Sequence, residues 1–577
     1  MNTLKFFSMI VLLGLSLLPA HAGDPDLGPN VLIFGPADDA KVIQSKCDEI
    51  YGRQDAAQFG NERDAIFFKP GTYPGVTVNI GFYTQVYGLG KSPDDVILPN
   101  GIHCDAKWMS GNATCNFWRG IENFTAGDTG KPDENIMWAV SQAAPMRRMH
   151  IIGKFWLFQW DGHPNWSSGG FMADSLVDGQ IISGSQQQWL SRNSAWKSWS
   201  NGVWNMVFVG CKNAPSGTWP DKNYTTVEKT PIIREKPFLY IDSDGSYKVF
   251  VPGERKDSVG YSWEDHQFVG NSIPLTDFYI AKSDKDTAAT INDALSKGKN
   301  LLLTPGIYKL DEAIHVTRPN TIVLGLGMAT LTPQKGNAAV EVADVSGVEI
   351  ANMILDAGSV NSPYLMQVGE PGCKASHADN PTILYDIFAR IGGGAQLGVA
   401  TSAVIINSND VIGDHAWLWR ADHGNMVAWN SNKSDNGLIV NGNNVTYYGL
   451  FAEHFQKDIV QWNGENGRTY FYQCELPYDP PTQSDYMHGS VKGWPGYKVS
   501  DNVKTHEAWG LGIYSFYTND GIFCDNACEV PKTPGVKIHH ICTVGFKDKN
   551  GIVSVINGVG GSTMSSKGKP MQVIDYP

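Results

Sequence analysis

The chain has 577 residues and a formal net charge of −13, with 11% aromatic and 18% charged residues. A nucleic-acid partner would require a basic surface, so this acidic balance argues against one and disfavours a highly anionic substrate. The length exceeds what one ordinary core needs, so we expect two domains or one long repetitive architecture. Beyond the first 22 residues no run of 18 apolar residues occurs, and no membrane span is expected.

Residues 1–22 have the organisation of a secretory signal peptide. Lys5 supplies a positive n-region, the apolar run MIVLLGLSLLPA follows, and the small residues Ala20 and Ala22 fit a cleavage site. We therefore expect a secreted, extracellular protein, in which disulfide bonds are permitted.

The nine cysteines all follow this segment. Cys104 with Cys115, and Cys524 with Cys528, are close enough in sequence to predict loop-stapling disulfides, and the odd number leaves at least one unpaired thiol. A zinc site would need two tight Cys/His clusters, which the sequence lacks. Asn-x-Ser/Thr sequons predict glycans on surface loops, although chance in an Asn- and Ser-rich chain explains them equally well. They occur at Asn112, Asn123, Asn165, Asn223, Asn432 and Asn444.

Short β-rich segments recur at spacings of roughly 20 to 25 residues, separated by Gly, Asn, Asp and Ser. This pattern is typical of a parallel β-helix, in which each coil buries its apolar residues only by stacking on the next coil. Long helical periodicity is scarce, so we predict an all-β fold.

A larger unit occurs twice. RDAIFFKPGTYPGVTVNIGFYTQVYGLG begins at Arg63 and KNLLLTPGIYKLDEAIHVTRPNTIVLGLG begins at Lys299, and both contain a Pro-Gly-x-Tyr turn and a final Gly-Leu-Gly. An amphipathic stretch that predicts a short helix precedes each copy, and such a helix would cover the open end of a β-helix. We therefore predict a signal peptide at 1–22 and two tandem β-helix domains at 23–265 and 266–577.

Three glutamines precede a tryptophan in the segment SGSQQQWLSRNS of the first domain. A glutamine side chain offers both a donor and an acceptor, so it can hold a water molecule or sugar hydroxyls. The alternative is a ladder of stacked glutamines that stabilises the coils, and this segment in isolation favours the ladder.

Two tryptophans alternate in GDHAWLWRADHG of the second domain. Trp417 and Trp419 would face the same side of a strand, and Asp422 and His423 follow at its end, where loop residues reach a cleft. A tryptophan platform with polar neighbours predicts a sugar subsite, and a buried tryptophan ladder explains the pattern equally well.

Glu453 and Glu475 are 22 residues apart, about one coil. Stacked strands lie ~4.8 Å apart and each residue advances ~3.3 Å, so the two carboxyl groups can be about 5–9 Å apart, as in glycosidases of either stereochemistry. Glu475 lies in YFYQCELPYDPP, where burial among aromatics such as Tyr478 would raise its pKa and keep it protonated for general-acid work. Glu453 has more polar neighbours and is expected to stay ionised and act on water. The alternative for both glutamates is that they are solvent-exposed residues on the coils without a catalytic role.

Five segments in order make the chain resemble glycoside hydrolase family 55. They are WAVSQAAP, GGFMADS, QQWLSRN, WLWRADHG and GLFAEHFQ with YFYQCELPYDPP. Members of that family are secreted exo-β-1,3-glucanases (laminarinases) built from two tandem right-handed parallel β-helices of the pectate-lyase type. The resemblance therefore implies hydrolysis of a neutral β-glucan from its end, with inversion.

The resemblance also implies roles for individual residues. Glu475 corresponds to the general acid, and Glu453 to the carboxylate that positions and activates water. The other implied catalytic residues belong to a polar relay that holds this water: Gln187, Gln188 and Gln159. The expected substrate contacts are Trp419, Asp422, His423, Tyr478 and Asn205, the last standing where the family has a relay serine.

Two other classes of function remain open. A polysaccharide lyase or epimerase acting on uronates would need a cation-neutralised carboxylate beside a Lys or Arg base, and the sequence offers only scattered Asp. A non-catalytic glycan-binding protein would use the same stiff scaffold without turnover. For the hydrolase, two carboxylates, a held water and an aromatic floor suffice, so we expect no metal or cofactor, a poly- or oligosaccharide as the partner, and a monomer.

Overall fold

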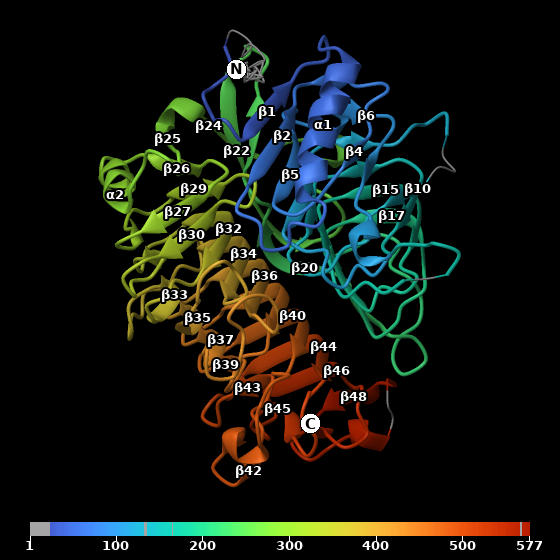
Figure 1. Ribbon diagram of the computed structural model, residues 1–577, viewed down its shortest axis with the longest axis vertical. Coiled ribbons are helices and arrows are strands. Elements are labelled where there is room, and N and C mark those ends of the chain that lie inside the picture. Colours follow the sequence, from blue (N-terminus) through green and yellow to red (C-terminus); the bar gives the residue numbers. More distant parts are fainter. Residues whose placement is uncertain (1–22, 132–134, 164, 566–567) are drawn as a thin grey trace, which may run out of the picture.

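The computed structural model describes residues 23–131, 135–163, 165–565 and 568–577, so the predicted signal peptide lies outside the described residues. Within these ranges no helix is long and apolar enough to cross a membrane. Parallel strands stack into two β-helices that lie side by side, the first coloured blue to green and the second yellow to red (Figure 1). This confirms the predicted tandem parallel β-helix fold.

Two parallel sheets form the walls of the N-terminal β-helix, each strand pairing with its counterpart in the next coil. The strands of the sheet that faces the second β-helix are, in spatial order, β1 (Val31–Phe34), β2 (Asp64–Phe68), β5 (Thr84–Gly88), β8 (Arg119–Glu122), β11 (Pro145–Arg147), β14 (Phe171–Ala173), β16 (Gln188–Arg192), β18 (Asn205–Val209) and β19 (Tyr224–Val227). The strands of the other sheet are β3 (Gly71–Thr72), β6 (Val96–Leu98), β9 (Thr125–Ala126), β12 (His150–Ile151), β15 (Leu176–Ile182), β13 (Lys154–Trp156) and β10 (Asn135–Met137), with β17 (Ala195–Ser200) on β15; β4 (Val78–Asn79) pairs with β7 (Ile102–His103).

The C-terminal β-helix repeats this plan with longer strands. Its sheet facing the first β-helix contains β25 (Phe278–Ala281), β26 (Asn300–Leu303), β29 (Ile322–Gly325), β32 (Glu349–Asp356), β34 (Ile383–Ile391), β36 (Ile412–Arg420), β38 (Thr446–Glu453), β40 (Gly467–Glu475), β44 (His506–Ser515), β46 (Val536–Gly545) and the antiparallel β48 (Met571–Tyr576). In the same sheet β30 (Thr330–Pro333) pairs with β32, and β27 (Ile307–Leu310) pairs with β30. Its outer sheet contains β28 (Ile314–Val316), β31 (Val340–Val342), β33 (Ser362–Val368), β35 (Ala400–Ile406), β37 (Asn436–Val440), β39 (Val460–Trp462), β43 (Tyr497–Val499), β45 (Phe523–Glu529) and β47 (Gly551–Ile556); β41 (Met487–His488) pairs with β42 (Val491–Lys492).

Antiparallel strands connect the two β-helices: β20 (Thr230–Arg234), β21 (Phe238–Ile241), β22 (Tyr247–Pro252), β23 (Glu254–Ser258) and β24 (Gly270–Pro274). The boundary predicted between residues 265 and 266 falls inside this connecting segment.

The two predicted helices are present, α1 (Ala40–Gln54) and α2 (Ala288–Ser296). Asp39 caps the first by accepting the backbone N–H of Lys41, and Thr287 caps the second by accepting that of Thr290. The apolar face of α1 packs into the core of the N-terminal β-helix, and that of α2 into the core of the C-terminal one. Each helix therefore covers the first coils of its own β-helix, as predicted.

A row of left-handed residues runs across the face that the C-terminal β-helix turns toward the first one. Residues with φ between +50° and +72° occupy the same register position on successive strands: Asn352, Asp386, His415, Gly449, Phe471, Gly510 and His540. The His415 ring stacks on Phe171 of the first β-helix at 4.5 Å between centroids. A Cβ on Gly449 would lie 3.0 Å from Phe171, and one on Gly510 would lie 2.4 Å from Val207. The row is therefore the line of closest approach between the two β-helices.

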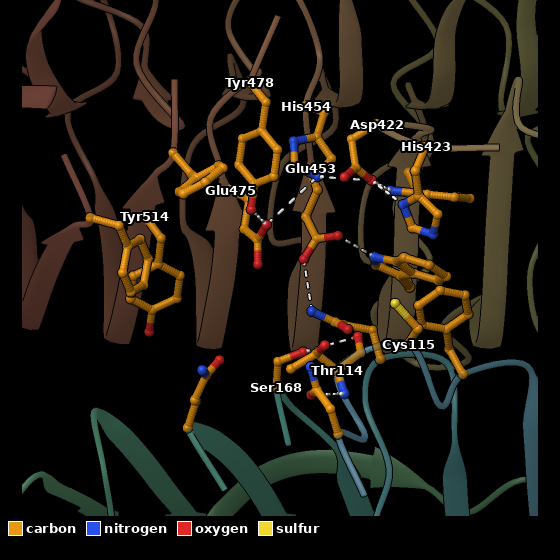
Figure 2. A pocket seen from close by; sticks show the side chains of 18 of the residues that line it. Thr114, Cys115, Ser168, Asp422, His423, Glu453, His454, Glu475, Tyr478 and Tyr514 are labelled. Atoms are coloured by element: carbon orange, nitrogen blue, oxygen red, sulfur yellow. Dashed lines mark hydrogen bonds and ion pairs between the residues drawn. The ribbon is translucent and has the colours of Figure 1, made fainter. Parts of the chain in front are cut away.

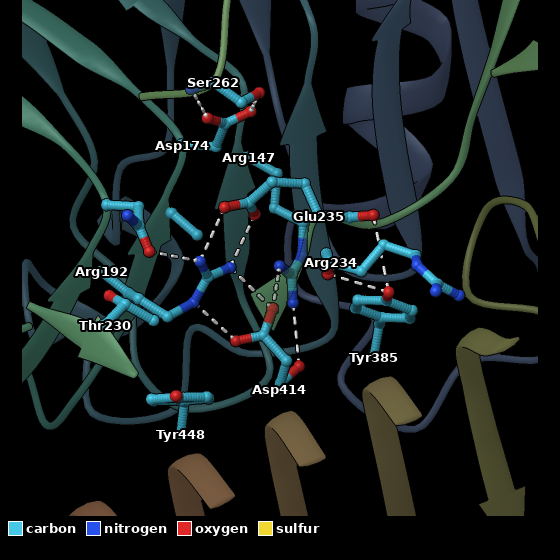
Figure 3. A network of polar contacts seen from close by, with 12 residues as sticks. Arg147, Asp174, Arg192, Thr230, Arg234, Glu235, Ser262, Tyr385, Asp414 and Tyr448 are labelled. Carbon is cyan, nitrogen blue, oxygen red and sulfur yellow. Dashed lines mark hydrogen bonds and ion pairs between the residues drawn. The ribbon is translucent and has the colours of Figure 1, made fainter. Parts of the chain in front are cut away.

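A buried ionic network joins the β-helices beside this row (Figure 3). The Arg147 guanidinium donates to Asp386 at 2.8 Å and to Asp414 at 2.6 Å, and Arg192 donates to Asp414 at 2.8 Å and to Glu235 at 2.7 Å. Burial opposes ionisation of Asp414, but the two arginines hold the pKa of its carboxyl below the ordinary value. Every charge in the network has an opposite partner, which a buried ion pair requires.

The predicted disulfides are wrong, because all nine cysteines are free thiols. Cys524 and Cys528 lie four residues apart on one extended strand, about 13 Å at ~3.3 Å per residue, and a disulfide tolerates no more than ~7 Å between Cα atoms. Cys104 is buried and accepts from Arg119 Nη1, whereas Cys115 lies on the surface of a cavity described below.

The structure also excludes two of the six predicted glycan sites. Asn123 and Asn432 are buried, and their side-chain amides donate to the carbonyls of Gly88 and Ile391 at 3.0 Å. A glycan on either side chain would break these bonds and displace the packed coils. Glycosylation at the other four sequons remains a prediction.

Gly510→Ala tests whether the two β-helices are in close contact at Gly510. The methyl group would meet Val207 and would also sit at φ +67°, so we expect a loss of about 1–2 kcal/mol from backbone strain and about 1–3 kcal/mol more from overpacking in the free energy of unfolding. Gly489→Ala is the matched control, because Gly489 has φ +62° but no atom within 4 Å of its Cβ position. Denaturant unfolding of both variants gives the difference, and equal losses would contradict the assigned contact.

Candidate active site

A cavity of about 510 Å³ opens between the two β-helices. Strand ends of the C-terminal β-helix form one wall, and loops of the N-terminal β-helix form the facing wall (Figure 2). Because parallel strands all end on the same side of a sheet, the residues after β36, β38 and β40 reach the cavity together. The C-terminal wall consists of Trp417, Trp419, Asp422, His423, Glu453, His454, Glu475, Tyr478, Tyr514, Phe516 and Phe546. The N-terminal wall consists of Asn112, Thr114, Cys115, Phe117, Gln142, Ser168, Gln187 and Trp204.

The two predicted acids lie on adjacent rungs. Glu453 ends β38 and Glu475 ends β40, the strand that pairs directly with β38. The backbone N–H of His454 donates to the carbonyl of Glu475 at 2.8 Å, which continues this pairing beyond the strand ends. Both acids therefore lie at the same cavity, on adjacent strands, as their separation of about one coil in the sequence predicts.

Glu453 lies at the buried side of the cavity and is 3% exposed. The indole N–H of Trp417 donates to Oε2 at 2.8 Å, and the Gln142 amide donates across from the other β-helix to Oε1 at 2.8 Å. Burial raises the pKa of Glu453 well above its ordinary value, and the neighbouring Glu475 adds to this rise. Glu453 has the polar neighbours expected of it, two N–H donors that stabilise its charged form, whereas the alternative of a solvated residue is wrong because Glu453 is buried.

Glu475 lies nearer the cavity opening, and its side chain is 22% exposed. The Tyr478 hydroxyl donates to Oε2, and His454 Nε2 lies 3.7 Å from the same oxygen. Burial raises the pKa of Glu475, whereas His454 and Tyr478 act in the opposite direction. The direction agrees with the sequence prediction that this carboxyl group tends to stay protonated.

A third carboxylate, Asp422, organises the end of the Trp-rich strand. Its Oδ1 accepts the Trp419 indole N–H at 3.2 Å and lies 2.9 Å from His423 Nδ1. Burial opposes the charge on the His423 ring, but Asp422 and the nearby Cys115 raise the pKa of this imidazole to about 10. These side chains present donors and aromatic faces to the cavity, as a sugar subsite requires. No group of three or more His, Cys, Asp or Glu in the described chain is placed to hold a metal ion.

The predicted relay residues are only partly brought together. Gln187 lines the cavity. Gln188 does not line the cavity; it is buried, and its amide donates to the Ser168 carbonyl at 3.2 Å. Gln159 is buried away from the cavity, where its Oε1 accepts the Ala106 N–H at 2.6 Å and its amide donates to Asp161.

Asn205 does not line the cavity either. Its amide donates to the Gly510 carbonyl at 2.9 Å, so it joins the two β-helices at the line of closest approach. The preceding residue, Trp204, points into the cavity in its place. A direct role of Asn205 in contacting substrate is therefore not supported, and its observed contact is structural.

Sequence reasoning missed Gln142, Ser168 and the closing aromatics Trp204, Tyr514, Phe516 and Phe546. Gln142 lies within WAVSQAAP, a segment noted only for its resemblance, and it contacts a residue 311 positions away. Trp417 was assigned to a platform, but its N–H serves Glu453. No local pattern in the sequence reports which side chain of a distant coil faces an acid.

Comparison with known proteins agrees with this geometry. The family model described as the LAM55 pectate lyase-like domain matches residues 278–475. An exo-β-1,3-glucanase of Streptomyces sp. (strain SirexAA-E / ActE) is 48% identical over 569 residues, covering 98% of this chain and 92% of the relative.

Two solved structures of sacteLam55A from Streptomyces sp. SirexAA-E superpose with a TM-score of 0.93 at 48% identity. One covers 96% of this chain and 100% of its own, and the other, a glutamate-to-alanine variant in complex with glucose, covers 96% and 99%. The chain therefore belongs to the Lam55 enzymes of glycoside hydrolase family 55, and it is a glycoside hydrolase.

Proposed function

We propose that this protein is an exo-acting β-1,3-glucanase in which Glu475 is the general acid and Glu453 activates the attacking water. One observation carries the proposal: two carboxyl groups end adjacent strands in a single aromatic-lined cavity. The name of the relative that is 48% identical, exo-β-1,3-glucanase, supports the linkage and the mode of attack. The N-terminal sequence supports secretion, and action as a monomer is part of the same proposal.

Glu475 is suited to protonate the leaving oxygen. It lies on the more open side of the cavity, and burial raises its pKa, so it can carry a proton and still reach a bound substrate. The hydroxyl of Tyr478 can donate or accept, so it tolerates both protonation states of the acid during turnover.

Glu453 is suited to stay ionised and to activate the attacking water. Both of its oxygens accept N–H groups, from Gln142 and Trp417, and an indole can only donate, so the negative charge of the pair is best held here. A carboxylate held in this way at 3% exposure is poorly placed to form a covalent bond to a sugar. Ser168 and Gln187 on the facing wall offer further groups for holding the water. This arrangement supports inversion.

The lyase alternative has less support. A uronate lyase needs a Lys or Arg base and a neutralised carboxylate, whereas the cavity lining contains neither Lys nor Arg among the described residues. A neutral sugar fits this surface better.

Glu475→Gln tests the general acid. We expect kcat on β-1,3-glucan to fall by about 10²–10⁴, because the leaving oxygen is no longer protonated. Hydrolysis of an aryl β-glucoside with a good leaving group should fall much less, since that leaving group needs no proton. Glu453→Gln should depress both reactions, because water activation is common to them. Kinetics that remain at the wild-type level in both variants would refute the assignment.

Removing the indole N–H beside Glu453 tests how its charge is held. In Trp417→Phe the carboxylate loses a donor that favours ionisation, so its pKa should rise further, and the acidic limb of the kcat/KM profile should move to higher pH. Trp118→Phe is the matched control: it lies in the same aromatic cluster, 5.4 Å from Trp417 between centroids, and its buried N–H has no partner among the described groups. An unchanged acidic limb in Trp417→Phe would contradict the role of this bond.

The stereochemistry of the first product is a separate test. Proton NMR during the first minutes of hydrolysis should show α-glucose before mutarotation, as inversion of a β-linkage requires. Initial release of β-glucose would instead indicate a covalent intermediate, and unsaturated products would indicate a lyase.

A further inference from the structure

His454 lies between two carboxylates of the cavity. Asp422 follows β36, His454 follows β38 and Glu475 ends β40, so the three side chains lie on adjacent coils. The Nε2 atom of His454 is 3.7 Å from Asp422 Oδ1 and 3.7 Å from Glu475 Oε2 (Figure 2). The His454 side chain is 3% exposed, so little water screens these charges. One ring nitrogen therefore faces both the carboxylate of the predicted sugar subsite and the proposed general acid.

The hydrogen bond of the other ring nitrogen determines which nitrogen titrates. Nδ1 of His454 lies 3.3 Å from the carbonyl oxygen of Leu476. A carbonyl oxygen can only accept, so Nδ1 carries a hydrogen atom in both charge states of the ring. Nε2 is then the nitrogen that gains or loses a proton. When it gains one, an imidazolium lies between two carboxylates; when it loses one, Glu475 no longer faces that cation.

The backbone of His454 holds the ring in this position. Its φ is +67°, in the left-handed region that residues other than glycine rarely adopt. The backbone N–H donates to the Glu475 carbonyl at 2.8 Å, and the backbone carbonyl accepts from Arg420 Nη1 at 3.2 Å. The ring packs edge-on against Tyr478, with 4.5 Å between the centroids, and the Tyr478 hydroxyl donates to Glu475. A strained residue held by so many contacts next to a catalytic group indicates a functional role.

We propose that His454 is a positioning residue that makes Glu475 a better proton donor, by stabilising the carboxylate that forms when the proton leaves. The inference rests on the proposed function, because it takes Glu475 as the general acid. The proton moves from Glu475 to the glycosidic oxygen as that C–O bond breaks, and an imidazolium 3.7 Å away favours the charged acid that results. An interaction that strengthens as the reaction proceeds accelerates the chemical step.

Asp422 supports this role from the other side of the ring. Burial opposes its charge, but the His454 and His423 rings lower the pKa of the Asp422 carboxyl group to about 2. Asp422 is therefore an anion at every pH at which the enzyme works, and an anion 3.7 Å from Nε2 favours the cationic ring. His454 thus connects the charge of the subsite carboxylate to the proton on the acid.

Other titratable groups surround the pair. Among the described residues they are, besides Asp422, Arg420 and His423 from β36 and its end, Glu453 from β38, Cys474, Tyr478 and Asp479 from β40 and the segment after it, Tyr514 from β44, and Cys115 from the facing wall. Arg420 is paired with Asp479 at 2.9 Å, and His423 with Asp422 at 2.9 Å. A substitution of His454 leaves all of these groups in the chain, so a change in the proton on Glu475 reports on the imidazole.

His454→Asn removes the titrating nitrogen and suits the backbone. Asparagine tolerates a positive φ, and its amide can donate to the Leu476 carbonyl in place of Nδ1. A general acid must be protonated, so activity is lost as the pH rises through its pKa. Without the imidazolium Glu475 holds its proton more tightly, and we expect the alkaline limb of kcat/KM on laminarin to move upward by about one pH unit.

The variant should also lose kcat on laminarin, roughly tenfold, because proton donation becomes less favourable. Hydrolysis of a dinitrophenyl β-glucoside should stay within about twofold of wild type, since that leaving group needs no proton. His540→Asn is the matched control. His540 has φ +56° and bonds through Nδ1 to Thr225 at 2.9 Å, but it does not line the cavity, so neither limb of the profile should move.

Infrared difference titration measures the proton on Glu475 without turnover. The carbonyl band of the protonated acid is the one that disappears in Glu475→Gln, and in His454→Asn it should persist to higher pH than in the unsubstituted protein. The proposal is overturned if the alkaline limb or this band stays in place or moves to lower pH, or if His454→Asn loses both substrates equally. Failure of the unsubstituted protein to cleave β-1,3-glucan would refute the proposed function instead, while the infrared titration still decides whether His454 controls this proton.

Discussion

The close packing of two parallel β-helices is the constraint on which the rest of the structure depends. A row of left-handed residues brings the backbones together, and glycine is needed where Gly449 and Gly510 meet side chains of the other β-helix. Beside that row, Asp414 accepts from both Arg147 and Arg192. A buried carboxylate with one partner removed is strongly destabilising, so the network tolerates one relative placement of the two β-helices. That placement sets which coils face each other at the cavity.

The cavity is a consequence of this placement and does not belong to either β-helix alone. Successive parallel strands carry Glu453 and Glu475 to one edge of the C-terminal sheet. The facing loops supply Gln142, which bonds to Glu453 across the interface, and Ser168 and Gln187. A shift of one coil between the β-helices would leave Glu453 buried without its amide donor, which is costly. The catalytic geometry and the interface are thus stabilised by the same contacts.

The sequence predicted those features that depend on local periodicity. Coil spacing, the repeated unit with its helix, and the juxtaposition of Glu453 and Glu475 all follow from the length of one coil. It did not predict features that depend on the direction of a side chain. Gln187 and Gln188 look alike in sequence, but only Gln187 lines the cavity, whereas Gln188 is buried with its amide on the Ser168 carbonyl. Cys524 and Cys528 do not form the predicted disulfide because they lie on one extended strand. Contacts across the interface, such as that of Asn205, leave no local pattern.

The two acids obtain different roles from their hydrogen-bond partners more than from their burial. Burial raises the pKa of both carboxyl groups and raises that of Glu453 more strongly, so burial alone would favour the proton on Glu453 and does not account for the proposed roles. The groups around Glu453 are N–H donors, and Trp417 can only donate. Protonating Glu453 would therefore replace a strong hydrogen bond to a charged acceptor with a weaker one to a neutral group. The partner of Glu475 is the Tyr478 hydroxyl, which can reverse its direction when the carboxyl group is protonated. A single proton shared by the pair is therefore best placed on Glu475, the more exposed acid and the one positioned to donate it.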